Sequence, residues 1–297
     1  MMFIQYYPRE ILASDVTLLE CIGSGSFGVV YRGKWRSSIV AIKKVCIASE
    51  LDRSALAQEL SLSSQVGNHP YVLPFIGACT SIPTHFLLLS KYCELGSIYD
   101  YVMVRKVELS QQQRTCFFAQ SASALQHLHT LNIIHRDVTS RNFLLGDPFH
   151  LYLADFSISR LLRKALTSSA TTSELGPIRW LSPESLFGGV YSFKTDVYMY
   201  ANFLYELLFL RVPFFELSNL FDVSDAIHEG RRPTLPSSIP AHLLKFFEAC
   251  WSTNPSDRYD MSTIVKLFES PDLFDNHPVL SSASDHYEKI SEISNIT

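Results

Sequence analysis

The sequence has little charge for its length and no excess of positive charge. Charged residues make up 18% of the 297 residues, and the formal net charge is -4. A chain without a large positive field has no general electrostatic basis for binding nucleic acid or an anionic membrane surface. Its 12 glycines and 14 prolines are also too few for a collagen-like or low-complexity chain. We therefore expect a globular protein that does not bind nucleic acid.

Cysteine is scarce as well, and its spacing excludes the usual cysteine-based sites. Six cysteines occur, none in a C-x-x-C pair and none in a Cys/His cluster with the spacing of zinc ligands. The N-terminal stretch MMFIQYYPRE lacks the basic and apolar regions of a secretory signal, and neither end carries a lipidation motif. We expect reduced thiols and a cytoplasmic location. The oligomeric state does not follow from these features.

Uninterrupted hydrophobic runs of membrane-spanning length are also lacking. The most apolar stretch, residues 196–215, contains Asn202, Glu206 and Arg211, and charges at the centre of a bilayer are costly. A helix that is apolar on nearly every face is typical of the core of a large domain. Since 47% of all residues are hydrophobic, the chain can bury such a core. We therefore predict a central core helix and no membrane span.

The order of the expected elements divides the chain into two lobes and predicts an α+β fold. Alternating apolar residues predict strands up to about residue 90, interrupted by one helix in the stretch ELDRSALAQELSLSSQV. Helical periodicity dominates afterwards, where Ser110 and Gln113 have the spacing of a capping box. The expected parts are an N-terminal extension (1–14), a small β-rich lobe with one helix (15–90), a connection (91–96), a larger mainly helical lobe (97–273) and a polar C-terminal tail (274–297).

A glycine-rich turn is the first feature with a chemical meaning. The stretch GSGSFG, Gly23 to Gly28, fits the pattern G-x-G-x-x-G, and strand-like residues rather than a helix follow it. In such a hairpin turn, glycines let backbone N–H groups approach phosphate oxygens without steric clash. An ordinary hairpin turn is the alternative explanation.

A lysine and a glutamate form the second feature. Lys43 ends the apolar strand VAIK, and Glu59 shares a helix face with Leu56 and Leu60. A carboxylate on an inward face needs a partner, and Lys43 is a good candidate. Held by Glu59, the Lys43 ammonium could reach the phosphates of a nucleotide. The alternative is a strand-end lysine that extends to solvent.

Three polar side chains after a buried helix form the third feature. In HRDVTSRN, Asp137 could accept the proton of an attacking hydroxyl, and Asn142 could hold a metal ion. Asp155 follows across a predicted hairpin, which can bring all three side chains together around Mg²⁺ and a phosphate. Positioning and charge neutralisation are what phosphoryl transfer requires. A charged turn that caps the helix is the alternative.

Taken in order, these motifs resemble those of eukaryotic protein kinases from about Thr17 to about Leu273. The resemblance implies the bilobal kinase fold in one domain at 15–273, with ATP, Mg²⁺ and protein substrates. It implies catalytic roles for Asp137, Lys43, Glu59, Arg136 and Arg141, and Mg²⁺ ligation by Asn142 and Asp155. The positions that it assigns to nucleotide binding are Ile22, Gly23, Gly25, Gly28, Val30, Ala41, Lys43, Ser90, Lys91, Tyr92, Cys93 and Leu144.

The resemblance also implies structural roles outside the nucleotide site. Glu184 in SPE would pair with Arg258, and Asp196 would brace the catalytic loop from the central helix. The stretches GSGSFGVVYRGKW and HRDVTSRN are most similar to the tyrosine-kinase-like group, most of whose members modify serine or threonine. We therefore favour serine or threonine as acceptors over tyrosine, with dual specificity as a possibility.

Regulation by phosphorylation is implied by Arg136, which precedes the predicted catalytic aspartate. A phosphate on the loop before SPE could pair with Arg136 and order that loop, and a merely polar loop is the alternative. The candidate acceptors are Thr167, Ser168, Ser169, Thr171, Thr172 and Ser173.

The motif LADFSISR departs from the family pattern because Ser157 stands where glycine is usual. A pseudokinase that binds nucleotide without transfer is therefore one alternative, and a small-molecule kinase is another. The polar positions expected of an active enzyme are all present, so we interpret Ser157 as a residue that restricts backbone freedom.

Overall fold

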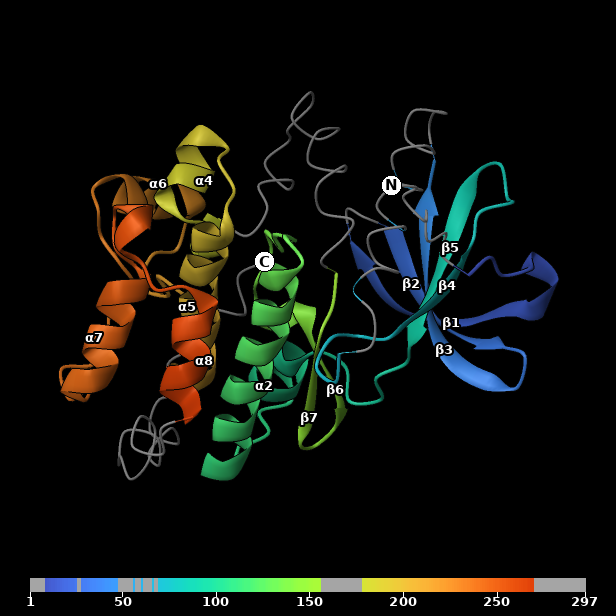
Figure 1. The fold of residues 1–297 in the computed structure, drawn as a ribbon, viewed down its shortest axis with the longest axis horizontal. Helices are drawn as coiled ribbons and strands as arrows, with labels where there is room; N and C mark the ends of the chain where they lie inside the picture. The colour runs from blue at the N-terminus through green and yellow to red at the C-terminus, as the bar shows by residue number, and fades with distance from the viewer. Residues whose placement is uncertain are drawn as a thin grey trace, which may run out of the picture.

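A computed structural model describes residues 9–25, 28–47, 69–155 and 178–269, together with Leu56, Leu60 and Val66. Figure 1 shows two parts: a strand-built lobe from the first part of the chain and a helical lobe from the later part. A two-stranded hairpin and the long helix α2 lie on the side of the helical lobe that faces the sheet. The predicted α+β bilobal architecture is confirmed.

The sheet of the first lobe has five antiparallel strands in the order β1-β2-β3-β5-β4. Successive side chains of a strand point to opposite faces of a sheet. Accordingly, Phe86 and Leu88 of β5 pack with Leu56 and Leu60, whereas Leu87 and Leu89 pack on the opposite face. The strands are β1 (Val16–Gly25), β2 (Gly28–Trp35), β3 (Ser38–Cys46), β4 (Phe75–Cys79) and β5 (His85–Lys91).

Part of the predicted N-terminal extension belongs to this sheet. Glu10 forms a parallel bridge with Ala78 of β4, and Ile11 is buried at 3% exposure. The carboxylate of Glu10 also accepts hydrogen bonds from the backbone and hydroxyl of Thr80. Ile11 therefore completes the apolar layer on one face of the sheet.

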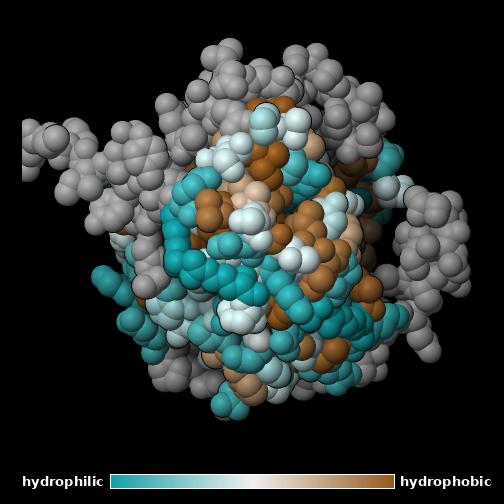
Figure 2. Space-filling view, turned by 90° about the vertical axis from the view of Figure 1, so that its right-hand side faces the viewer, coloured by the Kyte–Doolittle hydropathy of each residue, from teal (hydrophilic) through white to brown (hydrophobic). Residues whose placement is uncertain are grey.

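The outer surface of the sheet lobe is mixed in character. Figure 2 views the molecule from that end, and hydrophobic and hydrophilic side chains alternate over the visible face. The exposed large apolar side chains of this lobe are Leu12, Leu18, Leu19, Ile22 and Ile39. Ile22, with 45% of its surface exposed near the end of β1, can therefore contact a ligand.

The helical lobe is organised around α5 (Phe193–Phe209), in which every residue from Thr195 to Leu208 is buried. The other α-helices described in this lobe are α2 (Gln111–Thr130), α4 (Pro183–Gly188), α6 (Leu220–His228), α7 (Ala241–Cys250) and α8 (Met261–Glu269). The capping box at Ser110 and Gln113 is confirmed, because each residue bonds the backbone N–H of the other. Within the described ranges, no helix is both long and apolar enough to cross a membrane. The predicted core helix is thus α5.

A hairpin between the lobes positions the candidate site. Strands β6 (Phe143–Asp147) and β7 (His150–Leu153) pair as predicted, and Leu73 N donates to Leu153 O from the segment before β4. Asn142 comes directly before β6, and Ala154 N donates to its carbonyl oxygen at 2.8 Å. Because the two ends of a hairpin meet, Asn142 and Asp155 are brought to the same edge.

Candidate active site

Lys43 and Asp155 form an ion pair between the two lobes. The Lys43 ammonium nitrogen lies 2.9 and 3.0 Å from the two carboxylate oxygens of Asp155, 112 residues away in the chain. Partial burial alone would raise the pKa of Asp155, but the Lys43 charge and hydrogen bonds hold that pKa below its usual value. The Asp155 side chain keeps 47% of its surface exposed, so solvent screens the pair in part.

Asp155 is a partner of Lys43 that the sequence pattern did not indicate. Glu59 lies outside the described residues, so its pairing with Lys43 stays a prediction. Asp155 has φ 59°, a left-handed conformation that costs energy for any residue other than glycine. Such strain is typical of active-site residues.

Asp196 of α5 holds the loop that carries Asp137. The Asp196 carboxylate accepts hydrogen bonds from the backbone N–H of His135 at 2.7 Å and of Arg136 at 2.8 Å. His129 Nε2 donates to the same carboxylate at 3.0 Å. Asp196 is fully buried, so three donors compensate for its desolvation. The bracing role expected of Asp196 therefore has a direct geometric basis.

His135 joins the same loop to the residues before Asp155. Its Nε2 lies 2.9 Å from the carbonyl oxygen of Ala154, and its Nδ1 accepts from the Asp137 backbone N–H at 3.2 Å. Because a carbonyl can only accept, these two bonds require the tautomer with hydrogen on Nε2. The ring thus fixes the distance between the Asp137 loop and the strand end that carries Asp155.

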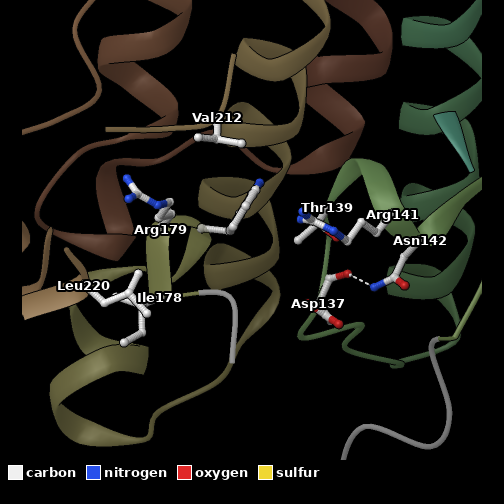
Figure 3. A pocket seen from close by; sticks show the side chains of 9 residues that line it. Asp137, Thr139, Arg141, Asn142, Ile178, Arg179, Val212 and Leu220 are labelled. Atoms are coloured by element: carbon white, nitrogen blue, oxygen red, sulfur yellow. Dashed lines mark hydrogen bonds between the residues drawn. The ribbon is translucent and has the colours of Figure 1, made fainter. Parts of the chain in front are cut away.

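Asp137 and Asn142 are neighbours, as their spacing suggested. Asn142 Nδ2 donates to the backbone carbonyl of Asp137 at 2.7 Å, shown dashed in Figure 3. Because Nδ2 makes this bond, Oδ1 is the side-chain atom of Asn142 that could coordinate a metal ion. Among the described residues, Asp137 Oδ1 is buried without a hydrogen-bond partner. A buried carboxylate oxygen without a partner is costly, so this atom fits a role in binding or in proton transfer.

A cavity of about 470 Å³ opens beside Asp137. Figure 3 shows Asp137, Thr139, Arg141 and Asn142 on one side of it, and Ile178, Arg179 and Leu220 on the other. The Arg141 guanidinium lies 3.9 Å from the ring centroid of Tyr99 and 5.5 Å from that of Trp180. Arg141, expected to be catalytic, therefore stacks on aromatic rings beside the cavity.

The predicted nucleotide-binding positions meet on neighbouring strands of the sheet. Ala41 of β3 pairs with Ser90 of β5, and Lys43 of β3 pairs with Val30 of β2. Leu144 of β6 forms a bridge with Ser97, just past the connection between the lobes. The strand register thus places the predicted nucleotide-binding residues on adjoining segments.

Two residues of the connection have side-chain environments that the sequence did not reveal. Lys91 Nζ donates to Tyr152 Oη at 2.6 Å, and this bond raises the pKa of Lys91. Cys93 is 7% exposed, and burial raises the pKa of its thiol to about 11 although Lys91 opposes the shift. Cys93 is therefore protonated at neutral pH, and the Lys91 side chain is held by Tyr152.

The glycine-rich turn is described except for residues 26–27. Gly23 pairs with Val30, and Gly25 pairs with Gly28. Gly28 has φ 124°, and a Cβ atom there would lie 2.2 Å from the carbonyl oxygen of Lys44. Gly28 is therefore required by both its backbone conformation and its neighbour. The predicted hairpin turn is confirmed, and its approach to a phosphate stays a prediction.

The pair implied for Glu184 and Arg258 is present. The Arg258 guanidinium donates to both carboxylate oxygens of Glu184, at 2.6 and 2.9 Å, and is itself fully buried. Partial burial raises the pKa of Glu184, but the Arg258 bonds lower it below its usual value. This bidentate pair connects α4 to the segment before α8.

Glu206 of α5 is a site residue that the sequence pattern showed only as an interruption of an apolar run. Its fully buried carboxylate accepts hydrogen bonds from Ser140 and Trp180, which adjoin the cavity beside Asp137. The signal that could have found it is the cost of a charge within a buried helix, which demands partners.

Several predicted features lie outside the described residues. They are Glu59, Ser157 and the six candidate phosphate acceptors of the loop before Ile178.

A family model described as protein tyrosine and serine/threonine kinase matches residues 16–268. The serine/threonine-protein kinase TNNI3K of Mus musculus is 35% identical over 264 residues, which is 86% of this chain and 31% of that protein. The dual specificity protein kinase pyk3 of Dictyostelium discoideum is 32% identical over 262 residues, 88% of this chain and 19% of that protein.

A viral protein is similar over more of this chain. The tyrosine-protein kinase transforming protein Abl of Abelson murine leukemia virus is 29% identical over 289 residues, 96% of this chain and 37% of that protein. The chain thus spans between 19% and 37% of the length of these three relatives.

Proposed function

Because the chain belongs to the protein tyrosine and serine/threonine kinase family, we propose that it transfers the γ-phosphate of ATP to hydroxyl groups of protein substrates. The observation that carries the proposal is the arrangement around Asp137, which lines the cavity and whose Oδ1 is buried with no hydrogen-bond partner among the described residues. The Lys43–Asp155 pair joins this loop to the sheet. The predicted domain, residues 15–273, contains all of these residues.

The residues fit a magnesium-dependent nucleotide. Asn142 Oδ1 and the Asp155 carboxylate are oxygen ligands of the kind that Mg²⁺ prefers. Bound there, the ion would neutralise charge on the phosphates of ATP. Lys43 would share its charge between Asp155 and the phosphates, and the backbone of Gly23 to Gly28 would cover them. Val30, Ala41, Ser90 and Leu144 would enclose the base.

The position of Asp137 beside the cavity suits it to assist transfer of the phosphate. The acceptor hydroxyl would lie in the cavity and donate a hydrogen bond to the Asp137 carboxylate. Its oxygen forms a bond to the γ-phosphorus while the bond to the bridging oxygen of ATP breaks, and ADP leaves with those electrons. The hydroxyl proton passes to Asp137.

We favour serine and threonine as acceptors, with dual specificity as a further possibility. The names of the relatives support this order, since they include a serine/threonine-protein kinase and a dual specificity protein kinase. A pseudokinase is not favoured, because Lys43, Asp137, Asn142 and Asp155 are all present, with Lys43 paired to Asp155 and Asn142 bonded to the Asp137 backbone. We also propose a cytoplasmic location, supported by six free cysteines.

We also propose that phosphorylation of the loop before Ile178 activates the enzyme. Replacing its six hydroxyl residues, from Thr167 to Ser173, by alanine should depress turnover strongly. Unchanged turnover would rule this regulation out.

The direct test of the function is transfer of labelled phosphate from Mg²⁺-ATP to the chain itself and to myelin basic protein, followed by phosphoamino acid analysis. We expect phosphoserine and phosphothreonine from the wild type and none from Asp137→Asn. Incorporation that persists in the variant would contradict the role of Asp137. Nucleotide binding without transfer by the wild type would favour a pseudokinase.

A further inference from the structure

Glu206 connects two segments that are far apart in the sequence. It lies on α5, and 0% of its surface is exposed. Its Oε2 accepts hydrogen bonds from Trp180 Nε1 at 2.9 Å and from the Ser140 backbone N–H at 3.2 Å. Its Oε1 accepts from the Ser140 hydroxyl at 2.7 Å. One carboxylate therefore holds a residue of each segment.

These two segments are the two walls of the cavity in Figure 3. Ser140 lies between Thr139 and Arg141, which form the wall with Asp137. Trp180 ends the short 3-10 turn Ile178–Trp180 on the opposite wall and is 5% exposed. Asn202, one turn earlier on α5, donates to the Trp180 carbonyl at 3.1 Å. The wall that contains Trp180 is thus bonded to α5 at two points.

We propose that Glu206 is a positioning residue for the protein substrate, which sets the separation of the two cavity walls next to Asp137. This inference rests on the proposed function, because it assigns the cavity to the acceptor segment of a substrate protein. Within the described part of the chain, the hydrogen-bond partners of Glu206 are Ser140 and Trp180, and neither is a predicted nucleotide-binding or metal-binding residue. Loss of Glu206 therefore affects binding and alignment of the acceptor protein more than binding of the nucleotide.

The geometry shows that hydrogen bonding, rather than charge, performs this role. A glutamine side chain can place its amide oxygen at the position of Oε2, where it accepts from both N–H groups. Its NH₂ group then faces the Ser140 hydroxyl, which can accept a hydrogen bond instead of donating one. A leucine of similar size leaves all three donors without an acceptor. Burial raises the pKa of Glu206 to about 7, so a neutral side chain is already close in free energy to the carboxylate.

The test compares Glu206→Gln and Glu206→Leu in steady-state phosphorylation of myelin basic protein. Losing the acceptor for a buried donor should raise KM for the acceptor protein about tenfold or more in Glu206→Leu. The Kd for Mg²⁺-ATP should stay unchanged in both variants. Glu206→Gln should keep the wild-type KM and kcat. A glutamine variant as impaired as the leucine variant would overturn the role of hydrogen bonding, and an unchanged KM in Glu206→Leu would overturn the proposal.

Trp180→Phe supplies a milder variant in case Glu206→Leu does not fold. It removes only the indole N–H donor, so it cuts the tie to one wall and leaves the Ser140 bonds in place. We expect a higher KM for myelin basic protein with the Kd for Mg²⁺-ATP unchanged. An increase in both KM and Kd, or no increase in either, would contradict the proposal.

Hydrogen exchange separates this inference from the proposed function. In Glu206→Leu, backbone amides of residues 137–142 and 178–182 should exchange faster than in the wild type, whereas Glu206→Gln should match it. If the wild type transfers no phosphate but these two segments respond as expected, the proposed function fails and Glu206 still positions the walls. If the wild type is active and the segments do not respond, the inference about Glu206 fails alone.

Discussion

The substitution Asp196→Asn should disrupt the loop that carries Asp137. Asp196 Oδ1 faces the Arg136 backbone N–H, and Oδ2 faces the His135 backbone N–H and His129 Nε2. Asparagine has only one oxygen, so its NH₂ group must face a backbone N–H at one of these positions, and two donors then oppose each other. Unlike a hydroxyl, a backbone N–H cannot become an acceptor.

The magnitude follows from the number of bonds lost. One charge-assisted hydrogen bond disappears, and a buried N–H is left without an acceptor, which together should cost roughly 3 kcal/mol of unfolding free energy. For a chain of 297 residues, with an unfolding entropy of about 2.1 cal/mol/K per residue, that loss corresponds to a decrease in Tm of about 5 °C. Displacing Asp137 by as little as about 1 Å should lower turnover about a hundredfold.

Thermal unfolding and phosphate transfer would both be measured, with Glu206→Gln as the matched control. That control makes the same carboxylate-to-amide change on the same buried helix. In Glu206, however, Oε1 faces the Ser140 hydroxyl, which can accept a hydrogen bond from the new NH₂ group. Asp225→Asn on the exposed face of α6 controls for the loss of charge alone. Wild-type Tm and turnover in Asp196→Asn would refute the reasoning, as would equal damage in both amide variants.

Three further changes have defined outcomes. Lys43→Met removes the ammonium that pairs with Asp155, so calorimetry should detect weaker Mg²⁺-ATP binding, and wild-type affinity would contradict the site. Arg258→Met leaves the Glu184 carboxylate without its partner, which should cost about 3–5 kcal/mol in denaturant unfolding, and adding Glu184→Leu should restore part of it. Burial raises the pKa of Glu206 from its ordinary value of 4.5 to about 7, so the folded protein binds a proton at Glu206 more readily than the unfolded chain does. Stability of the wild type should therefore fall as pH rises from 4.5 to 7, whereas Glu206→Gln should lack this loss, which could reach about 3 kcal/mol. A difference in Tm between the two proteins that stays constant from pH 5 to pH 8 would contradict this assignment.

Local pattern was sufficient for much of the fold. The strands on either side of the glycine-rich turn, the Ser110 capping box and the hairpin after Asn142 all depend on residues close together in sequence. Asp137 and Asn142 were also predicted correctly as neighbours, because the short turn Ser140–Asn142 keeps them together. The bilobal architecture followed from the change of periodicity along the chain.

The side-chain partners of the site were harder to predict. Lys43 could be recognised as a phosphate-binding candidate, but its contact with Asp155 depends on how the two lobes face each other. The Lys91–Tyr152 bond likewise joins the connection between the lobes to β7. Glu206 was visible in the sequence as a charge in an apolar run, but no local pattern indicates which donors it meets.

The sequence by itself determined which residues bear chemistry and which elements carry them, because turns, caps and strand alternation are decided by neighbours along the chain. Only the tertiary structure decided how those residues are paired. Asp196 and Glu206 lie on one helix, yet they brace different parts of the site, since packing around α5 brings the Asp137 loop to the first and both cavity walls to the second. Hydrogen bonds between distant segments form only once a buried helix has placed their donors and acceptors within reach.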